Sequence, residues 1–214
     1  MDALTEHEGL GVFSDAGIPV AEHALVEDAD GAAAAAAELG YPVVLKVDSA
    51  DVQHKTDMGA VMTAHDEEEV RKRFDLVMRN VEEAAPDADI EGVLVQEHLD
   101  GHEMIVGVNR DEEFGPVVMF GLGGIFVEIL HDVNFRALPL AERDARELVD
   151  EMRARALLDG VRGDPPADID AVVDVLLAVS DLVEDQPVAE LDINPLFVNA
   201  DGAVAADALV VMDR

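Results

Sequence analysis

The chain has 214 residues, half of them hydrophobic, and its 48 acidic residues against 14 basic ones give a formal net charge of −34. That charge argues against bare nucleic acid or an anionic membrane as partners, and the lack of cysteine excludes disulfides, thiolate catalysis and cysteine-ligated zinc. No run of about 18 apolar residues occurs that could span a membrane, and the acidic N-terminus is unlike a signal peptide. We therefore expect a cytoplasmic protein. So acidic a surface favours a salt-rich, halophilic cytoplasm, where surface acids repel one another weakly.

The hydrophobic periodicity predicts alternating helices and strands, without a linker or a convincing repeat. The first half predicts a helix over LTEHEGLGVFSDAG, a strand near 21–26, an alanine-rich helix ended by Gly40, strands over 42–48 and 60–65, a helix from Asp66 to about Ala85, and a strand over 92–99. The second half predicts strands over 102–111, 116–121 and around 125–129, helices near 141–158 and 168–184, and a final hairpin with its turn at 200–202. Hairpins mixed with crossovers favour an α+β fold of two lobes over a doubly wound parallel sheet.

Lys46 is the first candidate site residue, and it is one of only three lysines, with Lys55 and Lys72. Alternation along PVVLKVD places Lys46 on the same face of its strand as Val44 and Asp48. A lysine in so apolar a strand is costly unless its ammonium group meets an anion. The pattern suggests a lysine that reaches nucleotide phosphates from the wall of a cleft. A snorkelling lysine on an edge strand is the alternative.

Two loops carry further candidate groups. The loop HKTDMG places His54 beside Lys55, and a histidine next to a cation can bind a phosphate or carry one covalently; a plain surface turn is the alternative. Gly121, Gly123 and Gly124 follow a strand, and clustered glycines can aim backbone N–H groups at an anion. No Gly-Lys-Ser/Thr follows, so this is not a Walker loop. A strained turn without a ligand is the alternative.

The segment AELDINPLFVN indicates a metal site. In a strand, Glu190, Asp192 and Asn194 would face one side, and Asp207 would lie in an otherwise apolar strand on the returning arm of the hairpin. Carboxylate and amide oxygens suit Mg²⁺, which binds through a few protein ligands and the substrate phosphates. A solvated acidic edge is the alternative.

Several segments together, in chain order, resemble the ATP-grasp (beta) part of ADP-forming acetyl-CoA and acyl-CoA synthetases. They are GIPV, GYPVVLKVDSADVQHKTDMGAV, GVLVQEHLDGHEMIVGVNRDEEFGPVVMFGLGGIFVEILHDV, FRALPL, LLDGVRG and ELDINPLFV, with a closing DA. The HKTD and FGLGG…VE segments are specific to this branch, and the succinyl-CoA synthetase beta subunit is more distantly similar. The resemblance implies one ATP-grasp domain over 1–214. Its nucleotide cleft would separate a first lobe (20–95) from a second lobe (1–19 plus 96–214).

The resemblance also implies a reaction and a partner. The reaction is acyl-CoA + ADP + phosphate ⇌ acid + CoA + ATP, with acetyl as the expected acyl group. The partner is a CoA-binding alpha subunit that carries a phosphohistidine, with two alpha and two beta subunits in related enzymes. The ATP-grasp chain would pass the phosphoryl group between phosphohistidine and ADP/ATP, with Mg²⁺.

Matching by position assigns roles to individual residues. Lys46 and His54 match catalytic residues, respectively the phosphate-binding lysine and a histidine that relays phosphate. The expected nucleotide-binding residues are Lys46, Lys55, Gln96, Glu97, His98, Glu103, Gly123 and Gly124. Asn194 and Asp207 match the Mg²⁺ ligands, and Asp192 joins them as a candidate ligand. The chain has Gly59-Ala60-Val61 where the family has Gly-Gly-Val, which affects the detail of that loop.

Three other functions compete with this one. A different ATP-grasp ligase would join an acid to an amine or thiol without phosphohistidine, and the HKTD loop argues against it. A non-catalytic nucleotide-sensing module would not need the full set of matched residues, which this chain retains. An acidic cation-binding surface protein would not explain Lys46.

Overall fold

The computed structural model describes residues 2–52, 55–124, 131–160 and 165–213, which form two compact units. The larger unit comprises Met1–Leu4, Glu8–Val20 and Asp100–Arg214. The smaller unit comprises Thr5–His7 and Ala21–Leu99. Each unit combines helices with an antiparallel sheet, so the predicted mixture of α and β structure is confirmed. No described helix is long and apolar enough to cross a membrane.

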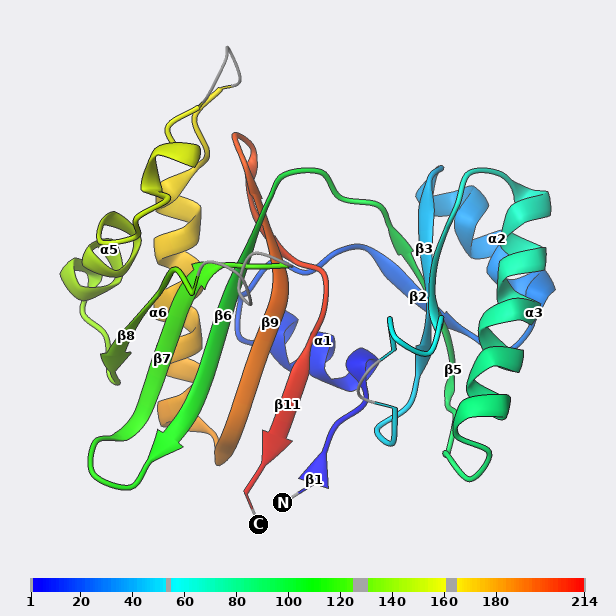
Figure 1. The fold of residues 1–214 in the computed structure, drawn as a ribbon, viewed down its shortest axis with the longest axis horizontal. Helices are drawn as coiled ribbons and strands as arrows, with labels where there is room; N and C mark the ends of the chain where they lie inside the picture. The colour runs from blue at the N-terminus through cyan, green and yellow to red at the C-terminus, as the bar shows by residue number, and fades with distance from the viewer. Residues whose placement is uncertain (1, 53–54, 125–130, 161–164, 214) are drawn as a thin grey trace. The chain divides into compact units, whose positions relative to one another are not determined.

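The smaller unit is a four-stranded antiparallel sheet covered on one face by two helices. The strand order is β2 (His23–Val26), β5 (Gly92–Glu97), β3 (Val43–Asp48) and β4 (Val61–Ala64). Helices α2 (Ala29–Leu39) and α3 (Glu67–Ala84) lie side by side against that sheet (Figure 1). Val43, Leu45 and Val47 of β3 pack into the core beneath the helices. The predicted alternation is therefore confirmed, because it leaves Lys46 and Asp48 on the face opposite α2 and α3.

Both helices of the smaller unit begin at aspartate caps. The Asp28 side chain accepts a hydrogen bond from the Gly31 N–H at the start of α2, and Asp66 accepts one from Glu69 at the start of α3. The predicted stop at Gly40 is also confirmed, since its backbone takes a positive φ of 90° after α2. These local signals explain why the helix boundaries could be predicted closely.

The larger unit is built on a seven-stranded antiparallel sheet. The order is β1 (Asp2–Ala3), β11 (Leu209–Met212), β9 (Val188–Asn199), β6 (His102–Asp111), β7 (Gly115–Leu122) and β8 (Val133–Ala137), and β10 (Gly202–Ala205) also pairs with β9. Helices α5 (Glu142–Asp150) and α6 (Ile169–Asp185) pack on this sheet (Figure 1). Helix α1 (Glu6–Asp15) begins in the smaller unit and contributes Leu10 and Phe13 to the core of the larger one.

The predicted helix over 141–158 is shorter in the structure. Helix α5 ends at Asp150, and a 3₁₀ turn, η1 (Arg155–Leu157), follows separately. The buried Asp132 carboxylate accepts hydrogen bonds from the N–H groups of Arg153 and Ala154, at 2.9 and 2.7 Å. These bonds divert the backbone from the helix, and a side chain so distant in the sequence could not be anticipated. The strand predicted around 125–129 lies outside the described residues, and strand β8 was not predicted.

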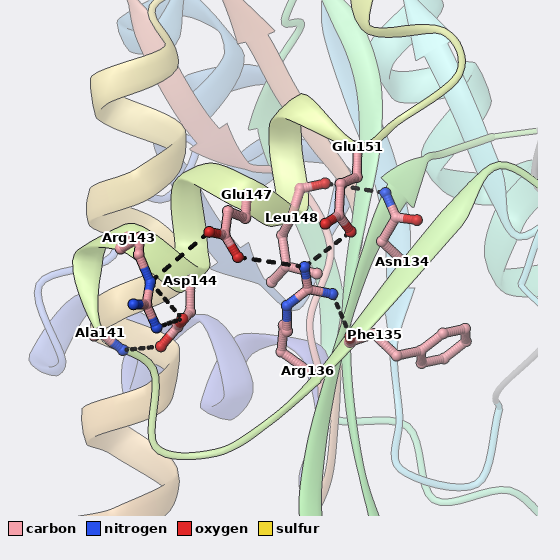
Figure 2. A network of polar contacts seen from close by, with 9 residues as sticks. All are labelled: Asn134, Phe135, Arg136, Ala141, Arg143, Asp144, Glu147, Leu148 and Glu151. Atoms are coloured by element: carbon pink, nitrogen blue, oxygen red, sulfur yellow. Dashed lines mark hydrogen bonds and ion pairs between the residues drawn. The ribbon is translucent and has the colours of Figure 1, made fainter.

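Strand β8 has two different faces, which Figure 2 shows beside α5. Asn134 donates a hydrogen bond to the Leu148 carbonyl at 3.1 Å, and Arg136 contacts Glu151 at 2.8 Å, both on the helix side. Phe135 points away from α5 and is 55% exposed. At Phe135, the face of β8 opposite α5 is therefore partly exposed.

The final hairpin differs from the prediction at Asp207. Asp207 lies in the segment 206–208 between β10 and β11, so the expectation that it sits within a strand is wrong. The partner strand explains the break, because Pro195 of β9 has no N–H to offer to a regular ladder. The register nevertheless persists across the break, with Leu196 opposite Ala205 and Asp192 opposite Leu209. Asp207 consequently falls opposite Asn194.

A glycine holds the end of β7 close to β6. The Gly123 N–H donates to the Glu103 carbonyl at 2.8 Å. A Cβ at Gly123 would lie 2.7 Å from the backbone carbonyl carbon and oxygen of Met104. Real Cβ atoms do not approach backbone so closely, so only glycine fits this position without displacing β6.

We expect Gly123→Ala to lower the free energy of unfolding by about 1–3 kcal/mol, because the methyl group overpacks against backbone that cannot move aside. Gly11→Ala is the matched control. Gly11 is exposed within α1 and an added Cβ would meet nothing within 4 Å, so alanine should stabilise the protein by about 0.5–1 kcal/mol. Urea unfolding of both variants measures the difference. Equal effects of the two substitutions would contradict the close approach.

Candidate functional site

Lys46 and Lys55 meet on one carboxylate in the smaller unit. The Lys46 ammonium donates to Glu6 Oε1 at 2.8 Å, and Lys55 pairs with Glu6 Oε2. Lys46 is 7% exposed and Glu6 is 2% exposed. Two of the chain's three lysines therefore converge at one buried position, as the sequence suggested for an anion site. The predicted nucleotide role of both lysines stays a prediction.

The electrostatics of Glu6 are set by opposing effects. Burial raises the pKa of the Glu6 carboxyl, while the charges and hydrogen bonds of Lys46 and Lys55 lower it by more, so its pKa falls below the usual value. A carboxyl with a lowered pKa stabilises the fold above its ordinary pKa. That stabilisation disappears as the pH falls through the lower, folded-state pKa. At neutral pH, Glu6 is thus a carboxylate shared by two ammonium groups.

Two buried polar groups on the same sheet face have an unmatched atom. Asp48 is fully buried; its Oδ1 accepts the His7 N–H at 3.1 Å, while its Oδ2 has no hydrogen-bond partner within the described parts of the chain. Gln96 is 2% exposed and its Nε2 is likewise unpartnered there. Native structures leave few such groups, and a ligand is one common reason for them.

Three predicted nucleotide-binding residues, Gln96, Glu97 and His98, lie at or just beyond the end of β5. Gln96 pairs across the sheet with Val44 and with His23, which places it on the face of Lys46. Glu97 instead uses its side chain locally, since Oε1 accepts the Glu22 N–H at 2.8 Å. His98 follows the strand and is exposed. Gln96 is the member of this trio with a buried donor still available to a ligand.

Four predicted residues of the larger unit lie together. The Gly124 N–H donates to Asn194 Oδ1 at 3.5 Å, and a Cβ at Gly124 would lie 2.1 Å from Glu103 Oε2. Gly123 bonds to the Glu103 carbonyl, as described above. The glycine turn thus rests between the Glu103 carboxylate and the Asn194 amide. Sequence reasoning named all four residues but could not show that they are neighbours.

The three predicted metal ligands also gather in one place. Burial first, then the charges of Asp207 and Glu190, raise the pKa of Asp192 to about 7. A nearby cation would relieve this repulsion, so the donor set of Asp192, Asn194 and Asp207 fits Mg²⁺ chemically. No group of three or more His, Asp or Glu side chains with metal-binding geometry occurs in the described ranges. The predicted set is not such a group, because one of its three members is the amide of Asn194. Its metal-binding role stays a prediction.

A pocket of about 580 Å³ lies in the larger unit and is lined by residues of β6, β7, β8, β9 and β11. Asp192 and Glu190 line it together with apolar groups, including Met119, Phe135 and Leu209. Of the predicted metal ligands, Asp192 therefore borders this pocket, whereas Asn194 and Asp207 are not among the residues that line it.

One predicted site residue lies outside the described residues, and one residue of the site was not predicted. His54 lies outside the described residues. Ala60, which replaces a glycine of the family pattern, is fully buried among the core residues of the smaller unit, where its methyl group packs. Glu6 was not predicted as a site residue. Lys46 in an apolar strand indicated an anion, but nothing in the sequence showed that the chain supplies one from 40 residues away.

Comparisons with known proteins identify the family of the chain. The ATP-grasp domain family matches residues 1–212. The chain is 44% identical over 216 residues to the beta subunit of ADP-forming acetate–CoA ligase II of Pyrococcus furiosus, covering 98% of this chain and 92% of that one. ADP-forming acetate–CoA ligase I of Archaeoglobus fulgidus is 48% identical over 207 residues, 96% of this chain. The chain spans only 30% of the length of that archaeal protein.

Solved structures show the same likeness. Acetyl-coenzyme A synthetase 1 of Ca. Korarchaeum cryptofilum, in complex with coenzyme A, Ca-AMPCP and HgCl⁺, superimposes with a TM-score of 0.94 at 43% identity, covering 99% of this chain and 94% of that chain. The predicted ATP-grasp fold is thereby confirmed. The chain belongs to the ATP-grasp family, and within it to the branch of ADP-forming acetate–CoA ligase beta subunits.

Proposed function

We propose that this chain is the nucleotide-binding beta subunit of an ADP-forming acyl-CoA synthetase, with acetyl as the acyl group. It exchanges a phosphoryl group between a phosphohistidine and ADP/ATP, so that acyl-CoA, ADP and phosphate give acid, CoA and ATP. The observation that carries the proposal is the buried convergence of Lys46 and Lys55 in a chain of net charge −34. So acidic a protein repels ADP, and a local cationic site is what would capture it.

The partner in this proposal is a CoA-binding alpha subunit that carries the phosphohistidine. The relative from Pyrococcus furiosus is named as a beta subunit, and a solved relative contains coenzyme A together with a phosphorylated phosphohistidine segment. An assembly of two alpha and two beta subunits follows the pattern of related enzymes. The alpha subunit would form the acyl phosphate and select the acid.

Lys46 and Lys55 bind the nucleotide phosphates in this scheme. Phosphoryl transfer depends mainly on positioning and on neutralising the charge of the phosphoryl oxygens, which ammonium groups provide. Gln96, Glu97 and His98 would meet the adenine, where the unpartnered Gln96 amide supplies a buried donor. Glu103 and the turn of Gly123 and Gly124 would contact the rest of the nucleotide.

Asn194 and Asp207 would hold Mg²⁺, with Asp192 beside them. A bound Mg²⁺ neutralises charge on the phosphate oxygens and orients them. The Asn194 amide is already oriented by the Gly124 N–H, and the Ala208 N–H donates to Asp207 Oδ1 at 2.9 Å. Both side chains are thus directed by backbone groups of their own unit before any ligand arrives.

His54 relays the phosphoryl group in this proposal. The N–P bond on the partner's phosphohistidine breaks as an N–P bond forms on His54. That second bond then breaks as a terminal phosphate oxygen of ADP forms the new O–P bond of ATP. The support is the position of His54 in the HKTD segment, next to Lys55, which shares Glu6 with Lys46.

We expect Lys46→Ala and Asp207→Ala each to reduce ATP formation by at least about 100-fold, because each removes a group that offsets phosphate charge. Circular dichroism should show both variants folded. Lys72→Ala is the matched control, since the remaining lysine is exposed on α3, and it should keep wild-type turnover. The assay mixes the chain with its CoA-binding partner, ADP, phosphate and acetyl-CoA. Wild-type turnover by both site variants would show that neither residue has the proposed role.

We expect His54→Asn to abolish phosphoryl transfer to ADP in the presence of the partner, since asparagine cannot carry the group. Acid-labile ³²P on the wild-type chain, absent from the variant, would identify the relay. Transfer at a normal rate by His54→Asn would show that the phosphoryl group passes directly. Complete absence of phosphohistidine from both chains would favour a different ATP-grasp ligase.

A salt-rich cytoplasm is part of the proposal, and it predicts that the melting temperature rises as KCl is raised from about 0.1 M to about 1 M. The Debye length falls from about 10 Å to about 3 Å over that range, which weakens repulsion among the acids. Thermal unfolding followed by circular dichroism measures the shift, and NaCl at equal ionic strength should act alike. A flat or falling melting temperature would count against salt adaptation.

A further inference from the structure

The Glu6 carboxylate contacts both lysines at once. Its two carboxylate oxygens are divided between Lys46 and Lys55, and the side chains of Glu6, Lys46 and Lys55 are 1%, 8% and 12% exposed. Two ammonium groups thus meet on one buried carboxylate, and each carboxylate oxygen has its own lysine.

The backbone of Glu6 is itself anchored to β3. Lys46 and Asp48 stand two residues apart on one face of that strand. Glu6 meets Lys46 through its side chain, and the next residue, His7, donates its N–H to Asp48 at 3.1 Å. That N–H belongs to the first turn of α1, where donors lack partners within the helix. Asp48 thus caps α1 and fixes the position from which Glu6 reaches the lysines.

Helix position also favours the ionised carboxylate. Glu6 is the first residue of α1, and the N-terminal end of a helix stabilises a negative charge. A lysine side chain is otherwise flexible, and its ordering on binding a phosphate costs affinity. When Glu6 has already ordered two lysines, a nucleotide meets ammonium groups that are in place.

We propose that Glu6 is a positioning residue that holds the Lys46 and Lys55 ammonium groups ready for the nucleotide phosphates. The inference rests on the proposed nucleotide-binding function and deepens it. The competing possibility is that Glu6 occupies the phosphate position and must be displaced, in which case its removal would strengthen nucleotide binding. The two possibilities predict opposite changes in affinity.

The test is calorimetric titration of the full chain with ADP and Mg²⁺, comparing wild type, Glu6→Gln, Glu6→Asp and a control. Glu6→Gln keeps the size of the side chain but removes its negative charge and replaces one of the two acceptor oxygens with an NH₂ donor. Glu6→Asp keeps the charge and retracts it by one methylene. The control is Glu67→Gln, which removes an exposed carboxylate of the first turn of α3 that pairs with Arg71 at 3.0 Å.

We expect Glu6→Gln to raise the Kd for ADP by about tenfold or more, consistent with losing ordered lysines. Glu6→Asp should recover part of that affinity, and Glu67→Gln should bind like wild type. With the partner present, the KM for ADP should rise in parallel for Glu6→Gln. A role in folding alone would reduce the number of binding sites titrated and leave Kd unchanged, because the folded fraction would bind normally.

Three results would overturn the inference in distinguishable ways. An unchanged Kd with fewer sites would make Glu6 purely structural. A lower Kd for Glu6→Gln would make Glu6 a competitor of the phosphates. A wild-type chain that binds no ADP at all would remove the proposed function itself, and the positioning role with it.

Discussion

The cost of burying charge is the constraint on which the smaller unit depends. An ammonium group on an apolar strand must meet an anion, and a buried carboxylate must meet cations. Lys46, Lys55 and Glu6 satisfy each other's requirement, and Asp48 fixes the helix that supplies the carboxylate. Such an arrangement contributes little to net stability compared with apolar packing. Its value lies in a defined geometry of charged groups, which binding of an anionic ligand needs.

In the larger unit, the charged groups near the predicted metal site are carboxylates. Burial of Asp192, together with the nearby charges of Asp207 and Glu190, raises the pKa of Asp192 to about 7. The smaller unit therefore presents cations partly neutralised by its own carboxylate, and the larger unit presents carboxylates that still repel one another.

Much of the fold could be predicted because its signals are local. Asp66 and Asp168 cap helices that begin where the sequence placed them, and alternation in β3 separated the faces correctly. The predictions that failed concern features that are set by contacts between residues far apart in the sequence. Asp132 diverts the chain after α5, and Pro195 interrupts the strand that would have held Asp207. Glu6 was missed for the same reason, because its partners lie 40 and 49 residues away.

The candidate site was predicted residue by residue, largely through family resemblance, but not as an arrangement. Composition and pattern indicated that Lys46 needs an anion and that Asp192 and Asn194 share a side. They could not show that the Gly124 N–H reaches Asn194 or that Asp48 and Gln96 retain unmatched polar atoms. Those facts come from the way strands β3, β5, β6 and β9 are registered with their neighbours.

The register of the last hairpin has an evolutionary consequence. Asp207 faces Asn194 only because the number of residues between the two arms of the hairpin is fixed. One residue inserted at the turn of Asn199–Asp201 would slide the returning arm and reverse which side each residue faces. Homologous chains should therefore vary freely in the exposed β6–β7 turn near Glu113, yet keep the length of this hairpin constant.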